Sequence, residues 1–164
     1  MMHRYTSKKI GGMKMLAKDI MEKAVISIDG DMSVEEIAKI LMKNKISGVP
    51  VVDEKKQVIG IVTEADLLSK EKEPRFPSYI EFLGSIIYIE GVKQYEEDLK
   101  KLVASKAKEI MTTPAHTVEE NATIEEVAAL MVEKRINRVP VVNTKGELVG
   151  IISRADMLKS LLNQ

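Results

Sequence analysis

The chain has 164 residues, with 25 basic and 25 acidic side chains and therefore no formal net charge. This length suits one sizeable hydrophobic core or two small ones. Balanced charge provides no global field that would gather nucleic acid or acidic lipid, so we expect neither as a partner. The absence of cysteine excludes disulfides, thiolate zinc sites and cysteine nucleophiles.

The beginning of the chain and its apolar runs indicate no membrane segment. Residues 1–15 show no periodicity, and the first of them are polar and basic without an apolar signal sequence. The longest apolar stretch, from Tyr79 to Val92, contains two glutamates and is too short to span a bilayer. We therefore expect a flexible N-terminal arm over residues 1–15 on a soluble, cytoplasmic protein.

The first structured segment follows the arm. Residues 16–21 read as a short lead-in turn, and residues 25–28 read as a strand. From Ser33 to Asn44, apolar residues recur at helical spacing, and Ser33-x-x-Glu36 is a capping box, which together predict a helix.

Two more strands and a helix complete this segment. The β-branched run 46–52, with proline near the strand entry, predicts an extended chain, and residues 58–62 predict a second strand after a turn. Thr63 then opens a helix that we expect to run through Lys70. The predicted order is strand, helix, strand, strand, helix.

A connector over residues 71–105 has no counterpart elsewhere in the chain. Pro74 and Pro77 indicate a break, after which the apolar residues of 79–87 predict one helical face and those of 95–103 predict a second. We expect a partly helical linker that folds back on the core. The alternative is an oligomer contact, since so many apolar residues are difficult to cover on a small monomer.

The segment before the connector recurs after it in strict register. Val49-Pro50-Val51-Val52 reappears as Val139-Pro140-Val141-Val142, and Asp66 reappears as Asp156, without insertion or deletion. Roughly 55 residues are duplicated in this way. We therefore expect an α+β fold of two β-α-β-β-α repeats, residues 16–70 and 106–164, that share one core.

Each repeat carries a hydroxyl and an acid where a strand meets a helix, Thr63-x-x-Asp66 and Ser153-x-x-Asp156. The pattern is typical of helix capping. It also suits a ligand, because the hydroxyl and the free amides can contact a phosphate while the acid accepts hydrogen bonds from a ribose diol. Both interpretations stay open from these residues alone.

Other candidate residues are weaker. His3 and His116 have no partner at metal-ligand spacing, and the chain has no Gly-rich phosphate loop or nucleophile elbow, so we expect no metal-binding or catalytic residue. Four methionines on apolar positions of the repeats are predicted to fill the core: Met21, Met42, Met111 and Met131.

The V-P-V-V strand followed by G-I-x-[T/S]-x-A-D, found twice, resembles the tandem CBS-domain pair, also called a Bateman module. The resemblance covers nearly everything except the arm and the connector. It implies that the repeats pack about a pseudo-twofold axis and bind adenine nucleotides or related adenosyl compounds, as regulatory ligands, in the clefts between their sheets.

The resemblance also assigns residues to two clefts. It places phosphate and ribose on the hydroxyl and the acid, and adenine against the chain just before the V-P-V-V strand and against the first strand of the opposite repeat. For one cleft it implies Ser153, Asp156 and Arg138, facing Lys23, Ala24, Val25, Ile46 and Ser47. For the other it implies Thr63, Asp66 and Gly48, facing Thr113, Pro114, Ala115, Ile136 and Asn137. Some nucleotide-binding members have a phosphate-contacting arginine where Arg138 stands, whereas Gly48 offers no charge.

The function expected from the resemblance is a stand-alone regulatory module that senses an adenosine-containing ligand and has no catalytic cofactor. We also expect a homodimer, because the apolar connector needs cover and such modules commonly associate. A ligand-free assembly module that presents the connector to a partner protein is the leading alternative. A small enzyme acting on the bound nucleotide is a third.

Overall fold

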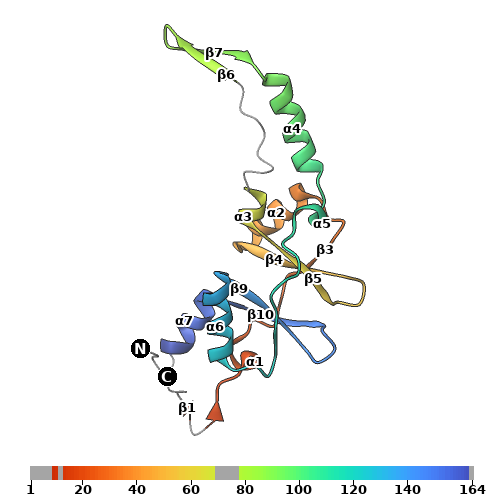
Figure 1. Ribbon diagram of the computed structural model, residues 1–164, viewed down its shortest axis with the longest axis vertical. Coiled ribbons are helices and arrows are strands. Elements are labelled where there is room, and N and C mark those ends of the chain that lie inside the picture. Colours follow the sequence, from red (N-terminus) through yellow and green to blue (C-terminus); the bar gives the residue numbers. More distant parts are fainter. Residues whose placement is uncertain (1–8, 11–12, 69–77, 163–164) are drawn as a thin grey trace. The chain divides into compact units, whose positions relative to one another are not determined.

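The computed structural model of the chain describes residues 9–10, 13–68 and 78–162 (Figure 1). The predicted arm lies largely outside this part of the chain, apart from two short paired strands, β1 (Lys9–Ile10) and β2 (Met13–Lys14). The described residues contain no helix long and apolar enough to cross a membrane.

Two sets of elements in the same order confirm the predicted repeats. The first set is α1 (Ala17–Ile20), β3 (Ile28–Asp29), α2 (Val34–Asn44), β4 (Gly48–Val52), β5 (Val58–Thr63) and α3 (Glu64–Leu67). The second set is α5 (Ala107–Ile110), β8 (Val118–Glu119), α6 (Ile124–Lys134), β9 (Arg138–Val142), β10 (Leu148–Ser153) and α7 (Arg154–Leu162). The fold is α+β, as predicted.

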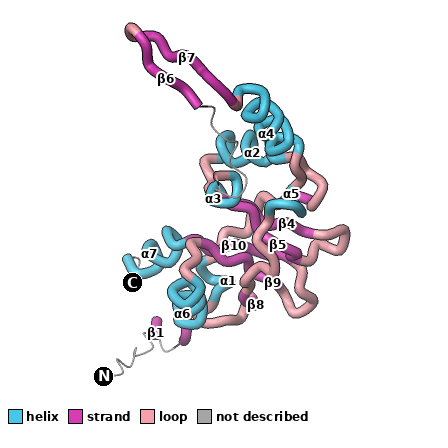
Figure 2. The backbone as a smooth tube through the Cα atoms, turned by 45° about the horizontal axis from the view of Figure 1, so that its top comes forward, coloured by secondary structure: helices cyan, strands magenta, loops and turns pink. Residues whose placement is uncertain are grey.

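Each repeat builds a three-stranded sheet, in the orders β3-β4-β5 and β10-β9-β8. The strands of the second sheet are labelled in Figure 2. In the second sheet β8 runs parallel to β9, and β10 runs antiparallel to β9. A parallel neighbour requires a crossover connection, which α6 supplies, whereas β9 and β10 need only a tight turn. The order of elements therefore follows from the sheet topology.

The predicted capping box forms at the start of α2, and its counterpart forms at the start of α6. The hydroxyl of Ser33 accepts from the amide of Glu36 at 3.3 Å, and the Glu36 carboxylate accepts from the Ser33 amide at 3.0 Å. Thr123 and Glu126 make the same exchange at 3.3 Å and 2.7 Å. Hydrogen bonds from Ser33 lower the pKa of Glu36, and those from Thr123 lower the pKa of Glu126. Sequence and structure thus agree on these helix starts.

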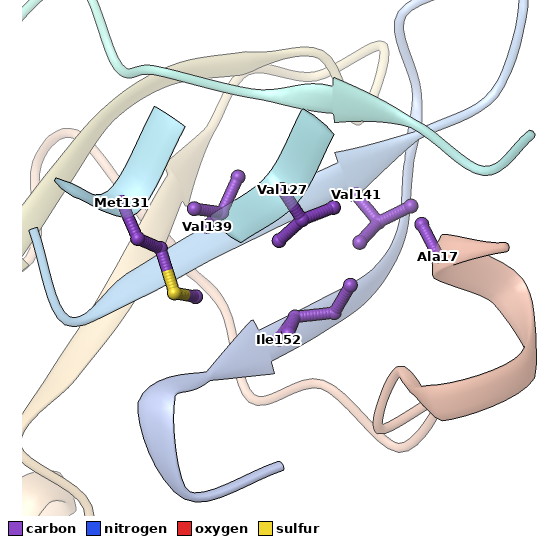
Figure 3. Packing of buried hydrophobic residues seen from close by; sticks show 6 residues of the cluster. All are labelled: Ala17, Val127, Met131, Val139, Val141 and Ile152. Carbon is purple, nitrogen blue, oxygen red and sulfur yellow. The ribbon is translucent and has the colours of Figure 1, made fainter. Parts of the chain in front are cut away.

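The core of the second repeat is a cluster of small and branched side chains between α6, the sheet and α1. Figure 3 shows Val127 and Met131 of α6 facing Val139 and Val141 of β9, with Ile152 and Ala17 beside them. Each of these six residues is at most 4% exposed, which accounts for the β-branched residues in the V-P-V-V strand. The corresponding positions of the first repeat, including Ile37, Val49, Val51 and Val62, are equally buried.

The lead-in helices do not pack on their own repeats. In α1, the amides of Ala17 and Lys18 donate to the carbonyls of Ala122 and Glu120 at 2.7 Å and 3.0 Å. In α5, the amides of Ala107 and Lys108 donate in the same way to the carbonyls of Met32 and Gly30. As a result, one compact unit consists of residues 1–26, 52–59 and 114–164, and the other of residues 27–51 and 60–113.

The first half of the connector has a different secondary structure from the one that the sequence predicted. Residues 79–87 were expected to form a helical face, but they belong to an antiparallel hairpin of β6 (Ser78–Phe82) and β7 (Ser85–Glu90). Leu83 and Gly84 both have positive φ, 50° and 78°, as a two-residue hairpin turn requires. The helix predicted over residues 95–103 is confirmed as part of α4 (Val92–Ala104).

Three smaller predictions also need correction. The strand expected from Val25 begins only at Ile28, because Glu22 pairs with a different strand, described below, and residues 23–27 form bends and irregular chain. The helix expected to run from Thr63 through Lys70 is a single turn that ends at Leu67, and residues 69–77 lie outside the described chain. Met42 is 80% exposed and does not fill the core, whereas Met131 does.

Candidate functional site

In the second repeat, the strand-to-helix junction is closed by one pair of polar side chains. The amide and hydroxyl of Ser153 donate to Asp156 Oδ2 at 2.8 Å and 2.6 Å, and the Asp156 amide donates back to Ser153 Oγ at 3.2 Å. The capping interpretation of this motif is therefore confirmed. The other carboxylate oxygen, Asp156 Oδ1, lies 4.0 Å from the ammonium group of Lys159, beyond a normal hydrogen-bond distance.

The first repeat closes the equivalent junction with one additional partner. The amide and hydroxyl of Thr63 donate to Asp66 Oδ2 at 2.7 Å and 2.8 Å. The hydroxyl of Thr112 donates to Asp66 Oδ1 at 3.0 Å. Both carboxylate oxygens of Asp66 therefore accept hydrogen bonds, whereas only one oxygen of Asp156 does so among the described residues.

A short segment that follows each lead-in helix lies beside the junction. Glu22 pairs with Ile151, two residues before Ser153 in β10, and the two residues exchange amide-to-carbonyl hydrogen bonds of 2.9 Å and 3.0 Å. Thr112 pairs with Ile61 in the same way, at 2.9 Å and 3.1 Å. Each junction therefore shares a compact unit with the lead-in segment of the other repeat.

The glycine of each G-I-x-[T/S] motif leaves room for this segment. A Cβ at Gly150 would lie 2.7 Å from Met21 Cγ, and a Cβ at Gly60 would lie 2.9 Å from Met111 Cγ. Real Cβ atoms do not approach other carbons so closely, so any side chain there would push the methionine away. The two glycines therefore leave room for Met21 and Met111, whose next residues, Glu22 and Thr112, pair with β10 and β5.

Arg138 begins β9 directly across from Ser153 in the sheet register. Directly opposed residues project their side chains on the same face, about 5 Å apart at Cβ. Gly48 holds the corresponding position at the start of β4 and is buried. The structure thus brings together Arg138, Ser153, Asp156 and Glu22, and we call these residues, with residues 23–25 that follow Glu22 in the same compact unit, the Ser153 site. Thr63, Asp66, Gly48 and residues 112–113 form the Thr63 site.

The residues before the central strands lie next to their own repeat's junction. The carbonyl of Asn137 accepts from the Arg154 amide at 2.8 Å, and the carbonyl of Ser47 accepts from the Glu64 amide at 3.0 Å. The sequence prediction had assigned Ile46 and Ser47 to the cleft of Ser153, and Ile136 and Asn137 to that of Thr63. Those assignments join residues of different compact units and stay predictions.

The remaining predicted residues belong to the lead-in segments. Lys23, Ala24, Thr113 and Pro114 are exposed, while Val25 and Ala115 are half-buried. The Glu22 side chain folds back on its own segment, where Oε1 accepts from the Ala24 amide at 2.8 Å. Among the described residues, no group of His, Asp or Glu side chains could hold a metal ion.

Sequence reasoning missed the residues at which the two junctions differ most. Thr112 and Glu22 occupy the same position of the repeat, as do Glu64 and Arg154. Aligning the repeats position by position shows these substitutions. Their importance emerges only when the pairing of Thr112 with Ile61 places its hydroxyl on Asp66.

Comparison with solved structures shows similar folds with adenosine compounds bound. CBSX2 of Arabidopsis thaliana in complex with AMP has a TM-score of 0.69 and 22% identity, over 91% of this chain and 97% of that chain. The CBS domain pair of protein MJ0100, in complex with 5′-methylthioadenosine and S-adenosyl-L-methionine, has a TM-score of 0.66 and 27% identity, over 92% and 98%.

Sequence comparison shows the family. An uncharacterised protein of Methanocaldococcus jannaschii is 31% identical over 160 residues, which cover 93% of this chain and 95% of that protein. The family model of the CBS domain matches residues 17–73 and again residues 107–163. These two matches take in most of the chain, which therefore belongs to the CBS-domain family and carries two CBS domains in tandem.

Proposed function

We propose that this protein is a regulatory module that binds an adenosine-containing ligand at the Ser153 site. The observation that carries the proposal is the convergence, within one compact unit, of a capped helix start, the arginine opposite it and the exposed lead-in segment. Similar folds hold AMP in one case and 5′-methylthioadenosine with S-adenosyl-L-methionine in the other, which supports an adenosyl ligand.

Each part of the ligand has a chemical partner in this site. A ribose diol can donate to Asp156 Oδ1, which accepts no hydrogen bond from the described residues. A phosphate can accept from the guanidinium of Arg138 and from Ser153 at the positive end of α7. Adenine then lies against the segment Lys23, Ala24 and Val25, next to Asn137. The Thr63 site offers Thr63 and Asp66 to a second nucleoside, without a counterpart of Arg138 and with Thr112 already bonded to Asp66 Oδ1.

A regulatory role follows from what the ligand would contact. Residues 22–25 are tied to β10 by a single backbone pair, and a nucleoside bound to Asp156 and to this segment would add bonds between them. The ligand would thereby stabilise one arrangement of the lead-in segment over others. We expect no chemical change in the ligand, and we expect the protein to act in the cytoplasm.

Thermal unfolding against a panel of adenosyl compounds tests the proposal. A ligand at 100 times its dissociation constant stabilises the folded state by about 2.7 kcal/mol, which raises the melting temperature of a chain this size by several degrees. AMP, ADP, ATP, adenosine, 5′-methylthioadenosine and S-adenosyl-L-methionine form the panel, with GMP as the control for base recognition. Unchanged melting curves at millimolar concentration of every compound would contradict the proposal.

A second candidate function, assembly through the connector, is favoured by one observation. The hairpin turn and the strand after it expose apolar side chains, with Leu83 90% exposed and Ile86 60% exposed. We propose a homodimer that covers this surface. Light scattering at tens of micromolar should give the mass of a dimer, and deletion of residues 78–90 should reduce it to that of a monomer. A monomeric mass for the intact chain would contradict this candidate.

A further inference from the structure

We infer that the two sites of this chain are sorted by ligand charge, so that a phosphate-bearing adenosine ligand binds once per chain, at the Ser153 site. The inference rests on the proposed function and adds the charge and number of the ligands. It comes from five positions at which the repeats can be compared one to one: 22, 23, 138, 154 and 156 in the Ser153 site, and 112, 113, 48, 64 and 66 in the Thr63 site.

The charged groups at these positions differ between the sites. The Ser153 site has three cations, Lys23, Arg138 and Arg154, and the carboxylates Glu22 and Asp156. The Thr63 site has the carboxylates Glu64 and Asp66 and no cation at any of these five positions. A phosphate approaching the first site meets a net positive charge, and one approaching the second meets a net negative charge. Opposite charge raises both affinity and encounter rate, and like charge lowers them.

The first residue of the helix after each junction has opposite charge in the two sites. Arg154 begins α7 immediately after Ser153, and its amide donates to the Asn137 carbonyl at 2.8 Å. Glu64 begins α3 with the equivalent bond, from its amide to the Ser47 carbonyl at 3.0 Å. The backbones therefore match while the side-chain charges are opposite. Both side chains are exposed, so neither charge is needed to form the core.

Ribose recognition also favours the Ser153 site over the Thr63 site. Thr112 donates its hydroxyl to Asp66 Oδ1, so a ribose at the Thr63 site must share or displace an existing hydrogen bond. Glu22, at the same position of the other repeat, has no hydroxyl to donate, and its carboxylate is bonded to the Ala24 amide instead. Asp156 Oδ1 is therefore left available for the diol. Thr112 thus acts as a positioning residue that satisfies Asp66 in the absence of ligand.

Calorimetric titration of the full chain with AMP, and with the uncharged 5′-methylthioadenosine, tests the inference. We expect AMP to bind with a stoichiometry of one per chain. Arg154→Glu gives α7 the residue that α3 already has, and glutamate in the first turn of a helix is favourable, so the variant should fold. It should weaken AMP binding about three- to tenfold and leave 5′-methylthioadenosine binding unchanged.

Lys145→Glu supplies the matched control. Lys145 lies in the turn at the other end of the β9–β10 hairpin, beyond Leu148. Five residues of strand span about 16 Å. This exceeds the Debye length of about 8 Å at physiological salt, so the same change of charge there should leave AMP affinity unaltered. An equal effect of both variants would mean that only net charge matters and would overturn the inference.

The outcomes also separate this inference from the proposed function. Two equivalent AMP sites per chain, or an AMP affinity that Arg154→Glu leaves unchanged, would overturn charge sorting while the adenosyl-binding function stands. If neither AMP nor 5′-methylthioadenosine binds the wild-type chain at millimolar concentration, the proposed function fails and the inference fails with it. A stoichiometry of one AMP per chain, together with weaker AMP binding in Arg154→Glu, supports both the inference and the proposed function.

Discussion

The close approach of Met21 to Gly150 makes a substitution at this glycine the most informative test of how the site is built. Alanine at position 150 would place its Cβ 2.7 Å from Met21 Cγ and 3.0 Å from Met21 Cβ. Rotation about χ1 can move Met21 Cγ away, but Met21 Cβ is fixed to the backbone and stays 3.0 Å from the added carbon, closer than ordinary van der Waals contact. The helix that precedes Met21 or the strand that carries position 150 must move.

Such overpacking costs about 1–3 kcal/mol in a well-packed interior. For a chain of 164 residues, each kcal/mol corresponds to about 2–4 °C in melting temperature. Gly150→Ala should therefore lower the melting temperature by about 2–12 °C. Gly60→Ala should cost somewhat less, because the corresponding carbons of Met111 are 2.9 Å and 3.2 Å from the added Cβ.

A double-mutant cycle tests whether the Met21 side chain causes the loss of stability in Gly150→Ala. Met21→Ala removes most of the obstructing side chain, so the double variant Met21→Ala/Gly150→Ala should be more stable than the sum of the single losses predicts, by about 1 kcal/mol or more. Urea unfolding of all four proteins measures this coupling. Additive losses, or a Gly150→Ala variant as stable as the wild type, would refute the reasoning.

Three further predictions concern charge and hydrogen bonding. Hydrogen bonds and charge from Lys108, and then from Lys106, lower the pKa of Asp31. The stabilisation that Asp31 contributes is therefore complete above about pH 4 and is lost as the pH falls below that value. Asp31→Asn should make the free energy of unfolding in urea less sensitive to pH below about pH 4. Thr112→Val removes the hydrogen bond to Asp66 and should lower the free energy of unfolding by about 0.5–1.5 kcal/mol, measured in urea. Arg138→Ala should weaken AMP binding by about 1–3 kcal/mol in calorimetric titration while adenosine binding stays unchanged, because only the phosphate contact is lost.

Local signals in the sequence were sufficient to predict the helices and strands of the two repeats. The box Ser33-x-x-Glu36 marks the start of α2 to the residue, and the β-branched run around Val49 and Val51 marks a buried strand. Both signals act over a few residues of chain, and the duplication supplies each of them twice. This agreement between local preference and tertiary structure is typical of elements that form the core.

The connector shows where local signals are ambiguous. The apolar residues of 79–87 occur at helical spacing, but the run is short, and a short apolar run fits a strand as well as a helix. The β-branched and aromatic residues on both sides of Leu83-Gly84 favour the hairpin that the structure contains. Composition around the turn, rather than periodicity, was the decisive signal.

The details of the sites depend on contacts that sequence spacing cannot show. Thr112 meets Asp66 across 46 residues of chain because α5 packs on the first repeat and its following residues pair with β5. The sequence identifies Thr63 and Asp66 as a local motif, but nothing local indicates a third partner. The available oxygen of Asp156 is likewise evident only after Glu22 is placed on the Ala24 amide.

Asp156 is the residue that we propose to hold the ribose of an adenosine ligand. Calorimetric titration of wild type and Asp156→Ala with AMP and 2′-deoxy-AMP tests this proposal in one cycle. A hydrogen bond to a charged acceptor contributes about 1.5–3 kcal/mol, so removal of the 2′-hydroxyl should weaken binding to the wild type by about that amount and have no effect on Asp156→Ala. An equal loss in both proteins would show that the ribose binds elsewhere.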